Sequence, residues 1–196
     1  MPVELRKGQK VNLSKSVESN EFIINLNWTQ TIKKKGLFGT TKSQAVDLDL
    51  GAFVELSNGK KHCIQALGNS FGSLTDVPYV MLDGDDRTGE STDGENLRVN
   101  GKMSSNIRRL LIYTFIYEGA ANWQQVDGIV TIKCPGADDI VIKMDEYNSN
   151  NNMCAIAQIT NIDGNFSVEK LVNFFSGHEL MDKHFGWGFK WTVGRK

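Results

Sequence analysis

The chain has 196 residues, of which 40% are hydrophobic and 23% are charged, and its formal net charge at pH 7 is −1. This composition is ordinary for a globular protein, and a near-neutral chain has no overall positive field that would attract nucleic acid or an anionic membrane. No apolar run is long enough to span a bilayer, and the N-terminal residues lack the apolar core of a secretion signal. We therefore expect a cytoplasmic protein that has no transmembrane segment and does not bind nucleic acid.

The length suits one full-sized domain, and no stretch of the sequence has the composition of a linker. A single domain over residues 1–196 is therefore expected. The three cysteines, Cys63, Cys134 and Cys154, are widely separated and form no CxxC pair. This spacing favours buried, reduced thiols over a disulfide framework or a zinc site.

The first half of the chain is predicted to form short strands separated by turns. Apolar and polar residues alternate with the two-residue period of a strand, and Ser57-Asn58-Gly59-Lys60 is a strong hairpin signal. The expected strands cover residues 5–13, 21–28, 47–56, 61–66, 79–82 and 97–99. Residues 30–44 are polar and basic, and we expect them to form a long loop.

The second half continues the same pattern. Residues 109–117 are apolar on both faces, which is typical of a central strand buried on both sides. Further strands are expected over residues 129–133, 140–144, 154–161, 166–175 and 188–193, with a helical turn at 104–108 and short helices over 122–126 and 178–185. Many short strands with few helices predict an all-β fold, specifically a single-domain antiparallel β-sandwich with one to three short helices.

The strand over residues 47–56 carries two carboxylates. Because side chains alternate between the two faces of a strand, Asp47 and Asp49 leave the same face about 6.6 Å apart, at about 3.3 Å per residue. They could border one ion or two neighbouring ions. They could equally be solvent-facing residues at the entrance of a half-exposed strand.

Residues 82–96 form a strongly acidic segment in which Arg87 is the only basic residue before Arg98. Its carboxylates are Asp83, Asp85, Asp86, Glu90, Asp93 and Glu95. Their mutual repulsion is lowered if the segment is solvated or if it surrounds a hard cation with oxygen ligands. The EF-hand pattern fails, since Arg87 and Thr88 stand where it needs an acceptor and a glycine. Calcium suits such a crowded set of carboxylates better than magnesium, which keeps several waters.

These motifs together resemble the TerD-type tellurium-resistance family. The similar stretches are Asp47-Leu48-Asp49, the run from Gly84 to Gly89, the run from Asp93 to Asn96, and a terminal Gly–Trp motif at residues 187–191. The similarity is closest to the family's TerA-like branch and covers most of the chain.

The resemblance implies a bacterial stress-response protein that binds Ca²⁺ without being an enzyme and acts with other proteins of a tellurium-resistance assembly. With the resemblance included, the expected metal ligands are Asp47, Asp49, Asp85, Asp86, Asp93 and Glu95. Glu90 and Asn96 are further candidates. The calcium-ordered acidic segment is expected to present a surface to a partner.

Motifs of catalysis are not found in the sequence. It has no GxSxG motif and no phosphate-binding glycine loop, and the run from His178 to Asp182 does not complete the zincin HExxH pattern. A contact between His178 and Asp182, one helical turn apart, is the simpler interpretation. Two alternatives to the calcium-binding reading stay open: an interaction module that needs no metal, and a hydrolase that holds a catalytic metal in the acidic cluster.

Overall fold

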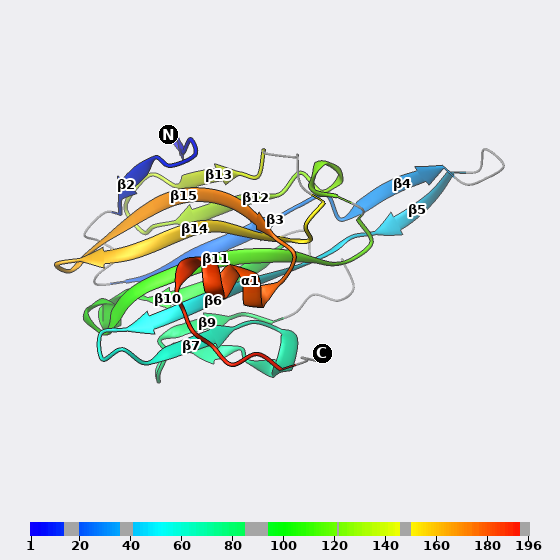
Figure 1. Cartoon of the computed structure of the whole chain (residues 1–196). Coiled ribbons are helices and arrows are strands. Elements are labelled where there is room, and N and C mark those ends of the chain that lie inside the picture. Colours follow the sequence, from blue (N-terminus) through cyan, green and yellow to red (C-terminus); the bar gives the residue numbers. More distant parts are fainter. Residues whose placement is uncertain (14–19, 36–40, 85–93, 121, 146–149, 193–196) are drawn as a thin grey trace.

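The structure, a computed structural model, describes residues 1–13, 20–35, 41–84, 94–120, 122–145 and 150–192. Two large β-sheets pack face to face, and every strand pair within them is antiparallel except β1–β13 (Figure 1). The first sheet has the order β1 (Val3–Glu4), β13 (Ile140–Lys143), β12 (Ile129–Lys133), β3 (Glu21–Asn27), β10 (Glu95–Asn100), β9 (Val80–Leu82) and β8 (Gly72–Ser73). The second has the order β2 (Lys10–Asn12), β15 (Asn165–Phe175), β14 (Met153–Ile162), β11 (Ile107–Glu118), β6 (Asp47–Leu56) and β7 (Lys61–Ile64). The predicted all-β sandwich is confirmed.

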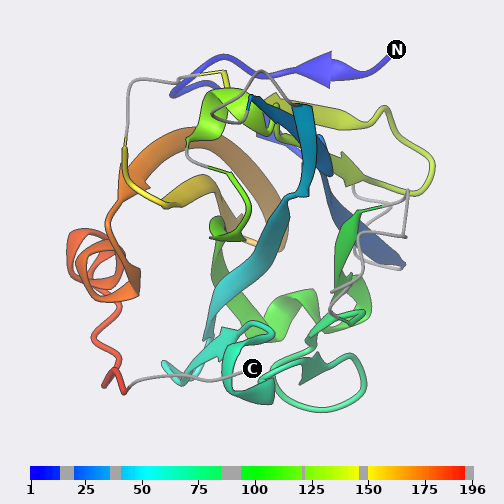
Figure 2. The same ribbon diagram turned by 90° about the vertical axis from the view of Figure 1, so that its right-hand side faces the viewer.

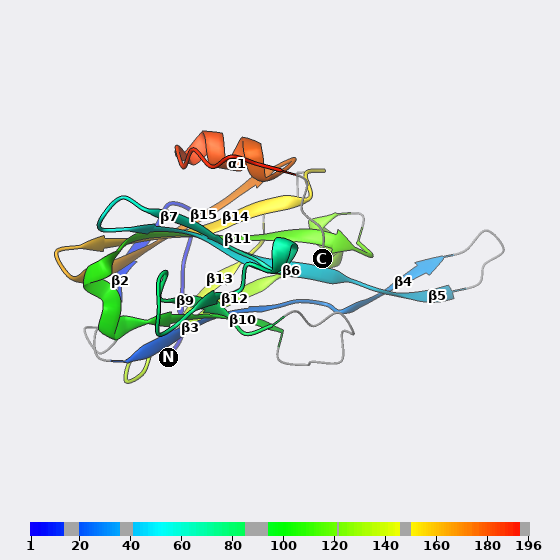
Figure 3. The same ribbon diagram turned by 90° about the horizontal axis from the view of Figure 1, so that it is seen from below.

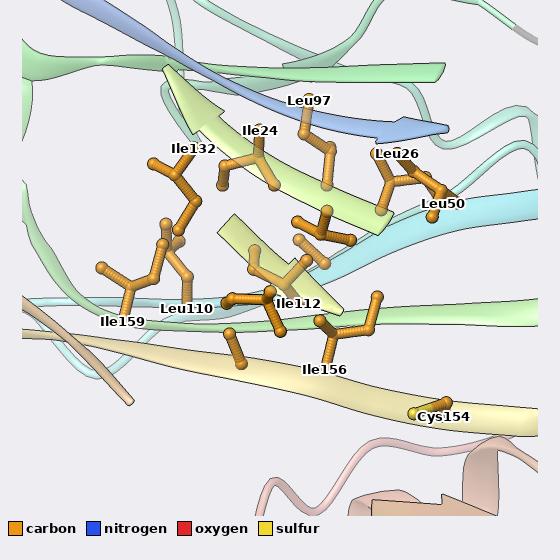
Figure 4. Close-up of a cluster of buried hydrophobic side chains, with 14 of the residues drawn as sticks. Ile24, Leu26, Leu50, Leu97, Leu110, Ile112, Ile132, Cys154, Ile156 and Ile159 are labelled. Atoms are coloured by element: carbon orange, nitrogen blue, oxygen red, sulfur yellow. The ribbon is translucent and has the colours of Figure 1, made fainter. Parts of the chain in front are cut away.

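The main hydrophobic core lies between the two sheets. Figure 4 shows Ile24 and Leu26 of β3 facing Leu50 of β6 and Ile112 of β11. All four side chains are completely buried. Full burial of an aliphatic side chain of this size contributes about 1.5–3 kcal/mol to stability. Burial of the apolar residues that alternate along the strands is therefore the main interaction that holds the two sheets together.

Strand β11 lies between β14 and β6, as expected from its two apolar faces. Leu110 and Ile112 point into the main core, whereas Leu111 and Tyr113 belong to a second hydrophobic cluster on the outer face of the same sheet. This outer face is covered by helix α1 (His178–Phe185), which Figure 2 shows outside the curved pair β14–β15.

The helices are few and short. Besides α1, the described residues contain three 3₁₀ turns: Leu67–Asn69, Gly101–Asn106 and Trp123–Gln125. The last two correspond to the helical segments expected near residues 104–108 and 122–126. Among the described residues, no helix combines the length and apolar character needed to cross a membrane.

The prediction of a long loop over residues 30–44 is wrong. Its described residues form a two-stranded ribbon of β4 (Thr31–Lys35) and β5 (Thr41–Ala45), which projects from the sandwich (Figure 3). Ile32 is buried, but Lys33, Thr41, Lys42 and Ser43 are exposed. Because both faces of the ribbon meet solvent, its sequence lacks the apolar alternation by which strands are recognised.

Two terminal strands also differ from expectation. The strand predicted over residues 5–13 forms only in part, as β2 at residues 10–12. The separate strand β1 precedes residue 5 and belongs to the other sheet, and a turn at Gly8 lies between the two strands. The strand predicted over residues 188–193 does not form in the described part, up to residue 192. There, the backbone N–H groups of Gly188 and Phe189 donate to the carboxylate of Asp182 instead of to a neighbouring strand.

Candidate cation site at the end of strand β6

Asp47 and Asp49 begin strand β6 on the face opposite the main core, as the alternation predicts. Leu48 and Leu50 point into the core between the sheets. Asp49 is completely buried, and Asp47 is half-buried. In the register with β11, Asp49 lies opposite Phe115. The carboxylate of Asp49 therefore lies on the outer face of the second sheet, beside the aromatic residues of the second cluster.

Glu95 reaches the same end of β6 from the other sheet. Its Oε2 accepts a hydrogen bond from the backbone N–H of Leu50, with an N···O distance of 2.6 Å. Strand β7 pairs only with residues 52–55 of β6, so this N–H lies beyond the end of β7. The carboxylate of Glu95 takes the position of a missing strand partner and places a third acidic group next to the peptide that joins Asp49 to Leu50.

The position of Glu95 depends on the glycine before it. Gly94 has φ +69°, and a Cβ at this position would lie 2.0 Å from the carbonyl oxygen of Leu26. Only glycine allows this close approach of two backbones. Across the neck of the acidic segment, the N–H of Asp83 donates to the carbonyl of Asn96 at 3.0 Å. The two described ends of the acidic segment therefore lie side by side next to Glu95.

Part of the predicted ligand set lies outside the described residues. These predicted ligands are Asp85, Asp86 and Asp93, together with the further candidate Glu90. Within the described ranges, no group of three or more His, Cys, Asp or Glu side chains is placed to hold a metal ion. Asn96, the other further candidate, accepts a hydrogen bond from the side chain of Asn25 at 2.9 Å through its Oδ1. The assignment of the ligands stays a prediction.

The described half of the site has the chemistry that a hard cation requires. Asp49 Oδ2 and Glu95 Oε1 are both shielded from solvent. Burying carboxylates costs several kcal/mol each unless opposite charge compensates them. Calcium is bound by oxygen ligands of this kind, so Asp47, Asp49 and Glu95 stay candidate ligands, although these described residues do not form a calcium site by themselves.

The register adds a carboxylate that sequence reasoning missed. Glu118 of β11 lies opposite Asp47, after a shift in register between Ile116 and Glu118. Opposite residues of an antiparallel pair share a face of the sheet, so Glu118 adds negative charge near Asp47. No local motif marks Glu118, because its position depends on an irregularity in the pairing of β6 with β11.

The aromatic cluster beside Asp49 is covered by a C-terminal cap, which we define as α1 with residues 186–192. Asp182 of α1 is buried and holds the cap together. Its carboxylate accepts hydrogen bonds from the backbone N–H groups of Gly188 and Phe189 and from Trp191 Nε1, at 2.5, 2.8 and 2.7 Å. Trp187 is buried, and its ring lies against Phe53 with the centroids 5.5 Å apart.

Arg109 of β11 ties this cap to the sheet. Its guanidinium lies 4.2 Å from the centroid of the Trp187 ring and donates to the carbonyl of Phe185 at 3.3 Å. It also forms an ion pair with buried Glu55 at 2.5 Å. Burial acts to raise the pKa of Glu55, but the hydrogen bond and charge of Arg109 outweigh it and lower that pKa.

The prediction of a contact between His178 and Asp182 is wrong. Both oxygens of the Asp182 carboxylate are used by residues 188–191. The ring of His178 instead packs against Tyr113, Phe115 and Trp191, with centroids 5.0–5.4 Å away. Its Nε2 is buried without a hydrogen-bond partner among the described residues. This burial lowers the pKa of His178 to about 4.

The cysteines lie on separate elements, as their spacing suggests. Cys63 is in β7, Cys134 follows β12, and Cys154 is in β14. Burial raises the pKa of both Cys63 and Cys134 to about 11. At neutral pH these two groups are therefore protonated thiols, whereas the thiolate is the form that attacks an electrophile or binds a soft metal.

The fold and the site together describe a β-sandwich protein with a candidate hard-cation site near one end of a central strand. The sequence profile of the TerD domain matches residues 1–138, so the chain belongs to the TerD domain family. It is 45% identical to the tellurium resistance protein TerA of an Alcaligenes species over 188 residues, which cover 95% of this chain and 56% of that protein. It is 31% identical to the tellurium resistance protein TerD of Serratia marcescens over 140 residues, or 65% of this chain and 66% of that one. The chain thus spans little more than half the length of the first relative.

Two solved structures share the fold. The crystal structure of SAV2460, a protein of unknown function, superposes with a TM-score of 0.59 and 13% identity, covering 84% of this chain and 95% of that one. A homologue of the telluride resistance protein TerD from Streptomyces coelicolor A3(2), SCO6318, gives a TM-score of 0.54 and 15% identity, with 83% and 94% coverage. At these identities the likeness concerns the fold alone.

Proposed function

We propose that this chain is a non-enzymatic calcium-binding protein that acts in tellurium resistance and related stress responses. The observation that carries the proposal is that Glu95, a buried carboxylate of the other sheet, accepts a hydrogen bond from the backbone N–H of Leu50, the residue that follows buried Asp49. The family to which the chain belongs includes relatives named for tellurium resistance, which supplies the biological setting.

In this proposal Asp47, Asp49 and Glu95 form the fixed half of the site, and Asp85, Asp86 and Asp93 complete it. Without the cation, these carboxylates repel one another across the neck of the acidic segment. Binding of calcium stabilises the folded state because the unfolded chain has no assembled site. It also holds residues 85–93 in one arrangement, which presents a surface to another protein of a tellurium-resistance assembly.

The cysteines support a role that does not involve direct chemistry on tellurium oxyanions. Reduction of such an anion by thiols needs accessible thiolates, and the raised pKa values of Cys63 and Cys134 keep them protonated at neutral pH. Cys154 is completely buried. The thiols are therefore suited to packing, and the carboxylates are the groups on which we base the function.

The proposal is tested by thermal unfolding of chelator-stripped protein, titrated with calcium and separately with magnesium. We expect a rise in the melting temperature that is selective for calcium and is lost in Asp49→Asn. Glu179→Gln, which changes an exposed carboxylate on α1, is the matched control and should keep the full rise. No rise with either ion would instead favour the metal-independent interaction module, and phosphoester hydrolysis lost in Asp49→Asn would favour the hydrolase.

A further inference from the structure

The C-terminal cap contains a cleft that the proposed function does not use. In Figure 1 the chain leaves α1 and runs past β7. Between α1 and this returning segment lies a cleft of about 550 Å³, which we call the cap cleft. Its lining includes Lys61 of β7, Glu179 and Lys183 of α1, and Phe189 and Trp191 of the Gly–Trp motif. Small-molecule sites have volumes of about 300–1,000 Å³, so the cap cleft is large enough for a ligand.

The aromatic wall of the cap cleft is held in place by hydrogen bonds to α1 and β7. Phe189 through its backbone N–H and Trp191 through its indole N–H both donate to the carboxylate of Asp182. Lys61 Nζ donates to the carbonyl of Trp187 at 2.5 Å and so joins the segment to β7. Trp187 is buried, whereas Phe189 and Trp191 are half-buried and keep part of their surface open. The wall is therefore formed before any ligand binds, which lowers the cost of ordering the site.

The charges of the cap cleft that lack a partner are mainly positive. Lys61 and Lys183 are exposed, and neither forms an ion pair within the part of the chain that the structure describes. The carboxylate of Asp182 already accepts three hydrogen bonds. Glu179, one helical turn before Lys183, is the other acidic residue of the lining. Two lysines against one carboxylate without a partner favour an anionic ligand.

The lining can bind an aromatic ring and an anionic group together. Half-buried aromatic side chains offer an apolar surface on which a flat ring packs, and ammonium groups bind carboxylates and phosphates through charge-assisted hydrogen bonds. We propose that the cap cleft binds a small planar aromatic anion, whose ring packs against Phe189 and Trp191 and whose carboxylate or phosphate is bound by Lys183. This binding is independent of the proposed calcium site, because the lining residues differ from the predicted calcium ligands.

The test is isothermal titration of the full chain in calcium-free buffer with indole-3-acetate and, separately, with adenosine 5′-monophosphate. Indole-3-acetamide and adenosine present the same rings without the negative charge. We expect saturable binding of at least one of the two anions with a Kd below about 1 mM, and about tenfold weaker binding of its uncharged analogue. The tighter of the two anions shows whether the cleft prefers a carboxylate or a phosphate.

Variants of the lining locate the binding. Lys183→Gln should weaken binding of the anion about tenfold, whereas Lys133→Gln, which changes an exposed lysine of the first sheet, is the matched control and should bind as the wild type does. Phe189→Leu should weaken binding because it removes ring surface, and Glu179→Gln should not weaken it because it removes an opposing charge. Equal binding of the anion and its uncharged analogue, unchanged binding by Lys183→Gln, weaker binding by Glu179→Gln, or no binding of either anion would overturn the proposal.

Discussion

Replacing Asp182 with alanine is expected to release the C-terminal cap from the sheet. The carboxylate accepts hydrogen bonds from two backbone N–H groups and the Trp191 indole. Each donor left without this partner costs about 1 kcal/mol where water can partly replace it, so the total loss is about 3 kcal/mol. For a chain of this size, that corresponds to a fall of about 6–12 °C in melting temperature.

The assay combines thermal unfolding with tryptophan fluorescence. Trp187 is buried and Trp191 is half-buried, so release of the cap should shift the tryptophan emission to longer wavelength and increase quenching by acrylamide below the melting temperature. Glu179→Ala, on the exposed side of α1, should change neither signal. A loss below about 0.5 kcal/mol in Asp182→Ala, with unchanged emission, would refute the role of these hydrogen bonds in fixing the cap.

Three further predictions concern the backbone, the acid stability and the thiols. Gly94→Ala should destabilise the protein by at least about 2 kcal/mol more than Gly59→Ala in denaturant titrations, because both have positive φ but only Gly94 meets a backbone carbonyl; equal losses would contradict the close approach. Since burial lowers the pKa of His178 from 6.5 to about 4, the unfolded chain takes up the proton first on acidification. The free energy of unfolding should therefore keep its full value above pH 6.5 and fall by about 3 kcal/mol as the pH is lowered to about 4. His178→Phe should remove this part of the pH dependence. A pH profile of the variant that superimposes on that of the wild type would contradict the assignment to His178. Cys63 and Cys134 should react with iodoacetamide at pH 7 far more slowly than free cysteine, as followed by mass spectrometry, and rapid labelling of the folded protein would contradict their raised pKa values.

The sandwich could be predicted from the sequence because most of its strands bury one face or both. Strand β6 shows this directly: Leu48 and Leu50 alternate with Asp47 and Asp49, and the structure places the two pairs on opposite faces. The ribbon of β4 and β5 could not be recognised in this way, since its exposed residues follow no apolar alternation. Alternation of apolar and polar residues indicates a strand with one buried face, so a strand without a buried face is hard to recognise in the sequence.

The candidate site was predictable only where its residues follow a local motif. The spacing of Asp47 and Asp49 identified one side of it, but the hydrogen bond from Leu50 to Glu95 joins residues far apart in the chain. Glu118 enters through the register of two strands, and no spacing rule relates it to Asp47. The same holds for Asp182, whose partners follow the helix and so could not be inferred from helical periodicity.

Isothermal titration of the chelator-stripped protein with calcium tests the central claim most directly. Our account predicts saturable calcium binding that Glu95→Gln weakens at least tenfold, that Glu179→Gln leaves unchanged, and that magnesium at equal concentration does not reproduce. Absence of calcium binding to the folded wild-type chain, or equal binding by the wild type and Glu95→Gln, would contradict the proposal that the carboxylates at the end of β6 hold the cation.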